Sequence, residues 1–63
     1  MLLWDTFFAA GQGQLASGAF KKAEELLKSA LAEADGFTAD DPRLLKTRLA
    51  LIEVYQKSGR SEE

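Results

Sequence analysis

The side chains of this chain that could take part in acid–base chemistry are mainly carboxylates, and some of them occur as adjacent pairs. Glu24 is followed by Glu25, and Asp40 is followed by Asp41. General acid–base catalysis needs two carboxylates that face one another across a pocket and have separated pKa values. Sequence neighbours on polar stretches fit a solvated helix face or a helix cap better. We therefore predict no catalytic residue.

Histidine and cysteine are both absent from the 63 residues. This composition removes disulfides, thiolate nucleophiles, the commonest metal ligand and the commonest general base. The glycines of GQGQLASG, residues 11–18, are reminiscent of a phosphate-binding loop, but the lysine and the preceding strand that such a loop requires are missing. We predict no metal site, no cofactor, no small-molecule substrate and no enzymatic activity.

The charge pattern and the length limit the choice of partners and compartment. The formal net charge is −2 with both signs interspersed, which argues against nucleic acid and against an anionic membrane surface. No stretch approaches the ~20 apolar residues that span a bilayer. The apolar start MLLWDTFFAAG lacks a positive n-region and is interrupted by Asp5, so we read it as structure and not as a secretion signal. We expect one small cytoplasmic domain.

A helix is predicted at residues 19–34, and the other predicted helices are expected to pack against it. Its apolar residues recur at steps of three and four, at Phe20, Ala23, Leu27 and Ala30. The opposite face is charged, and Glu24 precedes Lys28 by one helical turn in the favourable order. Because one side of this helix is apolar, it needs neighbours before and after it in the chain.

A first helix is predicted at residues 3–16, joined to the second by a tight break at Ser17 and Gly18. We expect Phe7 and Leu15 to face Phe20, Leu27 and Leu31 across one interface. Two glycines inside this helix each cost about 1 kcal/mol relative to alanine. We interpret Gly11 as a point of close approach between helices and Gly13 as merely tolerated.

The second helix is expected to stop near Asp35 and Gly36, with the glycine in a left-handed cap. In the following loop, Phe37 is expected to fold back over the end of the core. Asp41 followed by Pro42 predicts the start of a third helix at residues 42–58, because aspartate caps the N-terminus and proline suits the first helical position. Gly59 ends that helix, and the polar residues 60–63 are expected to be frayed.

The third predicted helix carries more apolar surface than one neighbouring helix requires. These residues cover over half of its circumference: Leu44, Leu45, Leu49, Leu51, Ile52, Val54 and Tyr55. An uncovered apolar patch on a small domain marks an interaction site, and a self-complementary patch gives a two-fold dimer.

Two segments of the chain share a pattern, and their glycines Gly18 and Gly59 are 41 residues apart. The first segment contains Phe7, Ala10, Gly11, Gly18, Phe20, Ala23, Leu27 and Ala30, and the second contains Leu51, Tyr55 and Gly59. With the ADDPRL sequence between them, they resemble the tetratricopeptide repeat family in its kinesin-light-chain-like spacing, over about one and a half repeats. The resemblance implies an all-α fold, an antiparallel helix hairpin plus a third helix, either as a fragment of a right-handed superhelix or as a three-helix bundle.

The resemblance also implies a protein–protein interaction module that binds a partner helix or peptide, a second copy of the chain included, through apolar helix faces. The aromatic cluster of the first helix, the concave surface of such repeats and the apolar third helix supply the candidate partner-binding residues Trp4, Phe8, Gln12, Leu15, Leu49, Ile52, Glu53 and Gln56. On the same family logic, Asp5 and Lys46 are also expected to line this surface. Two alternatives stay open: a structural or capping fragment of a longer solenoid, and a self-associating three-helix bundle with no separate ligand.

Overall fold

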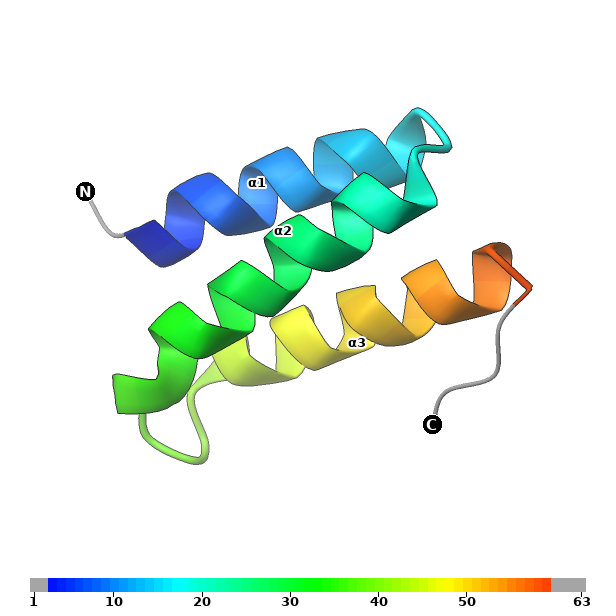
Figure 1. The fold of residues 1–63 in the computed structure, drawn as a ribbon. Coiled ribbons are helices and arrows are strands. Elements are labelled where there is room, and N and C mark those ends of the chain that lie inside the picture. The colour runs from blue at the N-terminus through cyan, green and yellow to red at the C-terminus, as the bar shows by residue number, and fades with distance from the viewer. Residues whose placement is uncertain (1–2, 60–63) are drawn as a thin grey trace.

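A computed structural model describes residues 3–59, which form three α-helices, α1 (Leu3–Ala16), α2 (Phe20–Glu33) and α3 (Pro42–Lys57), and a short 3-10 helix, η1 (Ala34–Gly36). The helices lie side by side, and α2 runs antiparallel to both α1 and α3 (Figure 1). No strand occurs within residues 3–59. The all-α hairpin with a third helix is therefore confirmed, and each predicted helix boundary lies within one residue of the observed one. The expectation for residues 60–63 falls outside the described part of the chain.

The turn between α1 and α2 depends on a glycine in the left-handed region. Gly18 has φ +85°, and its N–H donates to the carbonyl of Leu15 at 3.1 Å while the N–H of Ala19 donates to the carbonyl of Gln14 at 2.9 Å. These two bonds are those of a Schellman motif, which pairs the last carbonyls of the helix. The tight connection predicted at this point is confirmed.

Helices α1 and α2 come close together at Gly11, which is buried. A β-carbon placed on Gly11 would lie 2.7 Å from Cγ of Leu27, whereas a β-carbon on Gly13 would meet nothing within 4 Å. Both interpretations made from the sequence are confirmed: Gly11 permits a close helix contact, and Gly13 has no packing role.

The connection between α2 and α3 differs from the prediction in one respect. Among residues 3–59 only Gly18 and Gly59 have positive φ, so the left-handed cap predicted at Gly36 is wrong. Helix α2 instead tightens into η1, and the N–H of Phe37 donates to the carbonyl of Ala34 at 2.9 Å. Phe37 does fold back onto the core as predicted, because its ring packs edge-on against Trp4 with centroids 6.2 Å apart.

The start of α3 is fixed by Asp41 and Arg43. The carboxylate of Asp41 accepts the backbone N–H of Arg43 at 2.9 Å, as the predicted N-cap requires. The guanidinium of Arg43 donates to both oxygens of the same carboxylate, at 3.0 and 2.6 Å. It also lies over the ring of Phe37, 3.7 Å from the centroid. The loop is thereby attached to the first turn of α3.

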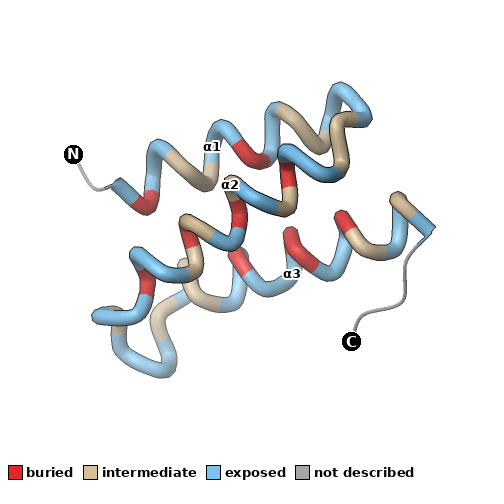
Figure 2. Tube along the Cα trace, in the orientation of Figure 1, coloured by how far each residue is buried: buried red, intermediate tan, exposed pale blue. Residues whose placement is uncertain are grey.

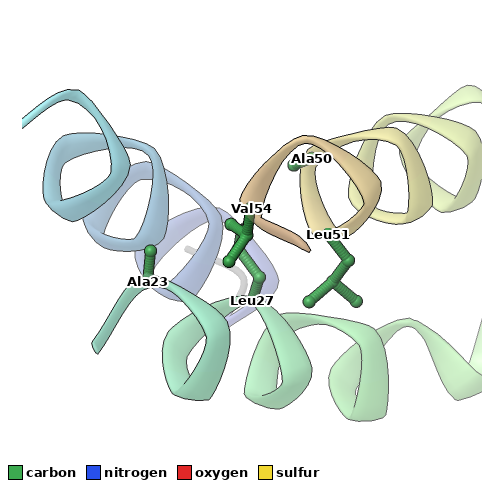
Figure 3. Close-up of a cluster of buried hydrophobic side chains, with 5 residues drawn as sticks. All are labelled: Ala23, Leu27, Ala50, Leu51 and Val54. Atoms are coloured by element: carbon green, nitrogen blue, oxygen red, sulfur yellow. The ribbon is translucent and has the colours of Figure 1, made fainter. Parts of the chain in front are cut away.

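Buried positions occur along all three helices (Figure 2), and they form two clusters in the core. One cluster, drawn in Figure 3, contains the buried residues Ala23, Leu27, Ala50, Leu51 and Val54. The other contains Trp4, Ala30 and Ala34. The small alanines of α2 let the larger side chains of α1 and α3 reach its backbone.

Phe7 and Leu15 both face α2, but Phe7 does not pack with Phe20, Leu27 and Leu31 as predicted. Leu15 packs with the Leu27 cluster, and Phe7 packs with the Trp4 cluster. Phe7 precedes Leu15 by about two helical turns, or about 12 Å along the axis. In an antiparallel pair, Phe7 therefore faces the C-terminal half of α2.

Candidate interaction surface

The outer face of α3 carries a stripe of exposed apolar side chains. Leu45, Leu49 and Ile52 are 59%, 54% and 41% exposed, and exposed Gln56 continues the stripe. Successive members are four, three and four residues apart, which places them on one side of the helix. We call these four residues the α3 ridge. Within residues 3–59, Leu3 on α1 is the other large apolar side chain with comparable exposure, at 58%.

The α3 ridge lies on the side of the helix opposite to the core. The residues of α3 that face its neighbours in the fold are Thr47, Ala50, Leu51 and Val54, all of which are buried. At 100° per residue, the centre of this buried set is about half a turn away from the centre of the ridge. Helix α3 therefore has two apolar sides, and the fold covers one of them.

The 41-residue spacing of the sequence pattern relates the ridge to a covered face of α1. Subtracting this spacing from the ridge gives the α1 positions Trp4, Phe8, Gly11 and Leu15. All of these positions pack against α2 or the clusters that it forms. In α1, these positions form the face that contacts α2. In α3, the corresponding positions form the exposed ridge, and no described helix packs on it.

A groove runs between α1 and α3 and consists of two adjoining hollows. A hollow of about 380 Å³ is lined by Phe8, Gln12, Lys46, Leu49, Ala50 and Glu53. A second hollow of about 480 Å³ is lined by Gln12, Leu15, Ala16, Gly18, Phe20, Glu53 and Lys57. Gln12 and Glu53 belong to both hollows. The groove combines aromatic and aliphatic walls with amide, ammonium and carboxylate groups.

A second groove lies on the other flank of the ridge, between α2 and α3. This groove, of about 400 Å³, is lined by Lys28, Leu31, Arg48, Leu51, Ile52 and Tyr55. Its floor is mainly aliphatic and aromatic, and the two cationic side chains border it. The hydroxyl of Tyr55 donates to Glu24 at 3.2 Å, and Lys28 contacts the same carboxylate at 3.1 Å, so one wall of this groove is held by polar contacts.

The structure brings most of the predicted partner-binding residues to this side of the molecule. Phe8, Gln12, Leu15, Leu49 and Glu53 line the groove between α1 and α3. Ile52 lines the groove between α2 and α3, and Gln56 lies on the ridge. Trp4 is the exception.

Trp4 is only 6% exposed and belongs to the core, so its indole does not contribute to an exposed surface. It stacks on Phe8 with ring centroids 4.8 Å apart, and its indole N–H donates to the hydroxyl of Thr47 at 2.8 Å. A tryptophan whose N–H has a partner can be buried without cost from an unpaired donor.

Three residues were not among the predicted partner-binding residues: Leu45, which belongs to the ridge, and Arg48 and Tyr55, which line the groove beside it. The alternating steps of four and three from Leu45 to Gln56 are the signal in the sequence that could have identified the full stripe. Apolar residues occur on two sides of α3. Their number alone does not show which side is buried in the fold and which side is exposed.

Comparisons with protein-family models, with curated proteins and with solved structures found no match. No helix of residues 3–59 is sufficiently long and apolar to cross a membrane. The same residues contain no group of three or more acidic side chains that could hold a metal ion.

Proposed function

We propose that this protein is a non-enzymatic interaction module, similar to a tetratricopeptide repeat, that binds an apolar helix or peptide of a protein partner on the α3 ridge and its flanking grooves. The observation that supports the proposal is the register relationship between α3 and α1. The α3 ridge corresponds to the face of α1 that packs against α2, yet Leu45, Leu49 and Ile52 are exposed.

Covering the ridge would release a substantial free energy. Burial of a leucine or isoleucine side chain stabilises a complex by about 1.5–3 kcal/mol relative to leaving it exposed. Part of this gain offsets the loss of translational and rotational freedom on association, so the net affinity is expected to be modest. We place the module in the cytoplasm as part of the same proposal, in keeping with its cysteine-free composition.

A structural role is the second candidate function, and the same register favours it. In this alternative the ridge is covered by the next helix of a longer array or by another bundle, and no separate ligand exists. The two functions differ in what they predict for an isolated chain offered a varied set of peptides. A binding module selects peptides, whereas a purely structural fragment does not.

Selection from a library of helical peptides displayed on phage tests the proposal. The wild-type chain is the target, and the selected peptides are then measured against the variants Leu49→Glu and Ile52→Glu. We expect peptides with apolar residues at steps of three and four, and we expect each variant to weaken their binding at least tenfold because it places a charge in an apolar contact.

Leu3→Glu is the matched control, because Leu3 is as exposed as Leu45 but lies on α1. Circular dichroism verifies that every variant retains its helices. Peptides that bind Leu3→Glu as tightly as wild type, but not the ridge variants, support the proposal. A library that yields no ridge-dependent peptide overturns it and favours the structural role.

A further inference from the structure

We infer that a second copy of this chain occupies the α3 ridge, with the two α3 helices antiparallel about a two-fold axis. The inference rests on the proposed function, because it names the partner of the surface proposed there. Its basis is the order of apolar and charged residues on the open side of α3.

The α3 ridge has the spacing of a two-stranded coiled-coil seam. Steps of four, three and four residues from Leu45 to Gln56 are the steps of heptad positions a and d. When two such helices run antiparallel with Leu49 opposite Ile52, Leu45 lies opposite Gln56 of the other copy. Both halves of the seam are then identical, which is the requirement of a two-fold interface.

The charges beside the ridge also complement themselves in this arrangement. Lys46 and Glu53 are seven residues apart on the same flank of the ridge, and both are exposed. Reversing the direction of the second helix brings Lys46 of each copy next to Glu53 of the other. Within one chain, Glu53 contacts only exposed Lys57 among the ion pairs of the described residues, at 3.9 Å, and such a pair contributes little.

The opposite flank of the ridge is compatible with the same arrangement. It carries Arg48 and Tyr55, again seven residues apart. In the antiparallel pair, the guanidinium of Arg48 lies beside the ring of Tyr55 of the other copy, where a cation–π contact is favourable. The opposed helix dipoles add a further small attraction.

The side chain of Ile52 favours a second α3 helix over a partner helix that would approach α3 as closely as α2 approaches α1. At the corresponding position of α1, Gly11 lets Leu27 approach to a distance that even a β-carbon would obstruct. Ile52 fills that space on α3, so a partner helix must stay further away. We expect the two α3 helices to lie about 8–10 Å apart, as interdigitating helices do.

A parallel pair is less favourable than the antiparallel one. It would align the two helix dipoles, which is unfavourable. It would also pair Glu53 with Arg48 instead of Lys46. The identity of the cation opposite Glu53 therefore distinguishes the two orientations by experiment.

Sedimentation equilibrium across a dilution series that reaches millimolar chain concentration tests the inference. We expect wild type to show a monomer–dimer equilibrium and Leu49→Glu to remain monomeric. Lys46→Glu and Glu53→Lys should each weaken the dimer about tenfold at low salt, because each replaces two attractive pairs by two repulsive ones. The double variant Lys46→Glu/Glu53→Lys should restore the wild-type dissociation constant within about twofold.

The exchange Lys21→Glu/Glu25→Lys is the control, because both residues are exposed on α2 away from the ridge. It should leave the dimer unchanged. A dimer that survives Leu49→Glu, or one that the double variant fails to restore, overturns the antiparallel ridge-to-ridge arrangement.

A wild-type chain that stays monomeric throughout also overturns the inference. If that monomer nevertheless selects peptides in a ridge-dependent manner, the proposed function stands and only the identity of the partner is wrong. If it selects none, both the inference and the proposed function fail.

Discussion

The indole N–H of Trp4 donates a 2.8 Å hydrogen bond to the hydroxyl of Thr47, and this buried bond joins the start of α1 to α3. The hydroxyl of Thr47 donates in turn to the carbonyl of Arg43 at 2.7 Å. Both helices pack mainly against α2. The Trp4–Thr47 bond, with the guanidinium of Arg43 5.9 Å from the centroid of the Trp4 ring, links α1 directly to α3. Thr47 is fully buried. Its hydroxyl is therefore the acceptor that keeps the indole N–H of Trp4 from being buried without a hydrogen bond.

Replacing Thr47 by valine should destabilise the fold by about 1–3 kcal/mol, because the shape is retained while the indole N–H loses its acceptor. The free energy of unfolding is measured by urea titration with circular dichroism as the signal. In a Trp4→Phe background the donor is absent, so the same Thr47→Val change should cost clearly less. Equal costs in the two backgrounds would show that the hydrogen bond contributes no stability.

Gly11→Ala and Gly13→Ala should have opposite effects on stability. Both changes improve helix propensity by up to about 1 kcal/mol. At Gly11 the new methyl group would lie 2.7 Å from Cγ of Leu27, which is fully buried and cannot move freely, so a net destabilisation of about 1–3 kcal/mol is expected. At Gly13 there is open space, and the propensity gain should appear as a raised urea midpoint. A stabilised Gly11→Ala variant would contradict the close helix contact.

The features that were predictable from the sequence are those whose cause is local. Gly18 lies between two helical patterns and can adopt the positive φ that ends a helix. Asp41 can cap a helix N-terminus, and Pro42 suits the first helical position. The close approach at Gly11 was also expected, since a glycine inside a helix costs stability and often marks a close neighbour. Gly13 carries the same cost without such a neighbour.

The features that were not predictable depend on residues distant in the sequence. Trp4 is buried because Thr47, Phe37 and Phe8 surround it, and the periodicity of the first helix contains no information about that cover. The same limit applies to α3. Its apolar breadth was evident from the sequence, but only the packed structure separates the side held by Val54 from the side exposed at Leu49.

The left-handed cap predicted at Gly36 was wrong because a glycine after a helix indicates where the helix ends but does not determine the sign of its own φ angle. Gly18→Ala should therefore lower stability by about 1–2 kcal/mol, since φ is +85° at this position. Gly36→Ala should be close to neutral, because φ is not positive at Gly36 and a β-carbon placed there would meet nothing within 4 Å. Thermal unfolding of both variants gives the comparison, and an equal loss at both positions would contradict the two backbone conformations.

Asp41→Asn should remove a part of the stability that depends on pH. Hydrogen bonds from the side chain and the backbone of Arg43 hold the pKa of Asp41 below its ordinary value, while the same carboxylate raises the pKa of Arg43. Because the pKa of Asp41 is lower in the folded than in the unfolded chain, its contribution is fully present above the ordinary value of about 3.9 and is lost as the pH falls through the folded value.

The stability difference between wild type and Asp41→Asn should accordingly be constant from neutral pH down to about pH 5 and shrink below about pH 4. Asparagine still caps the helix, so the variant isolates the charge of Asp41 and its pairing with Arg43. Asp40→Asn, which removes the adjacent exposed carboxylate, controls for the change in net charge. Melting temperatures of the three chains between neutral pH and pH 2 measure the effect. A difference that stays constant throughout would mean that the bidentate contact between Asp41 and Arg43 does not stabilise the fold, because a stabilising charged pair must weaken once its carboxylate is protonated.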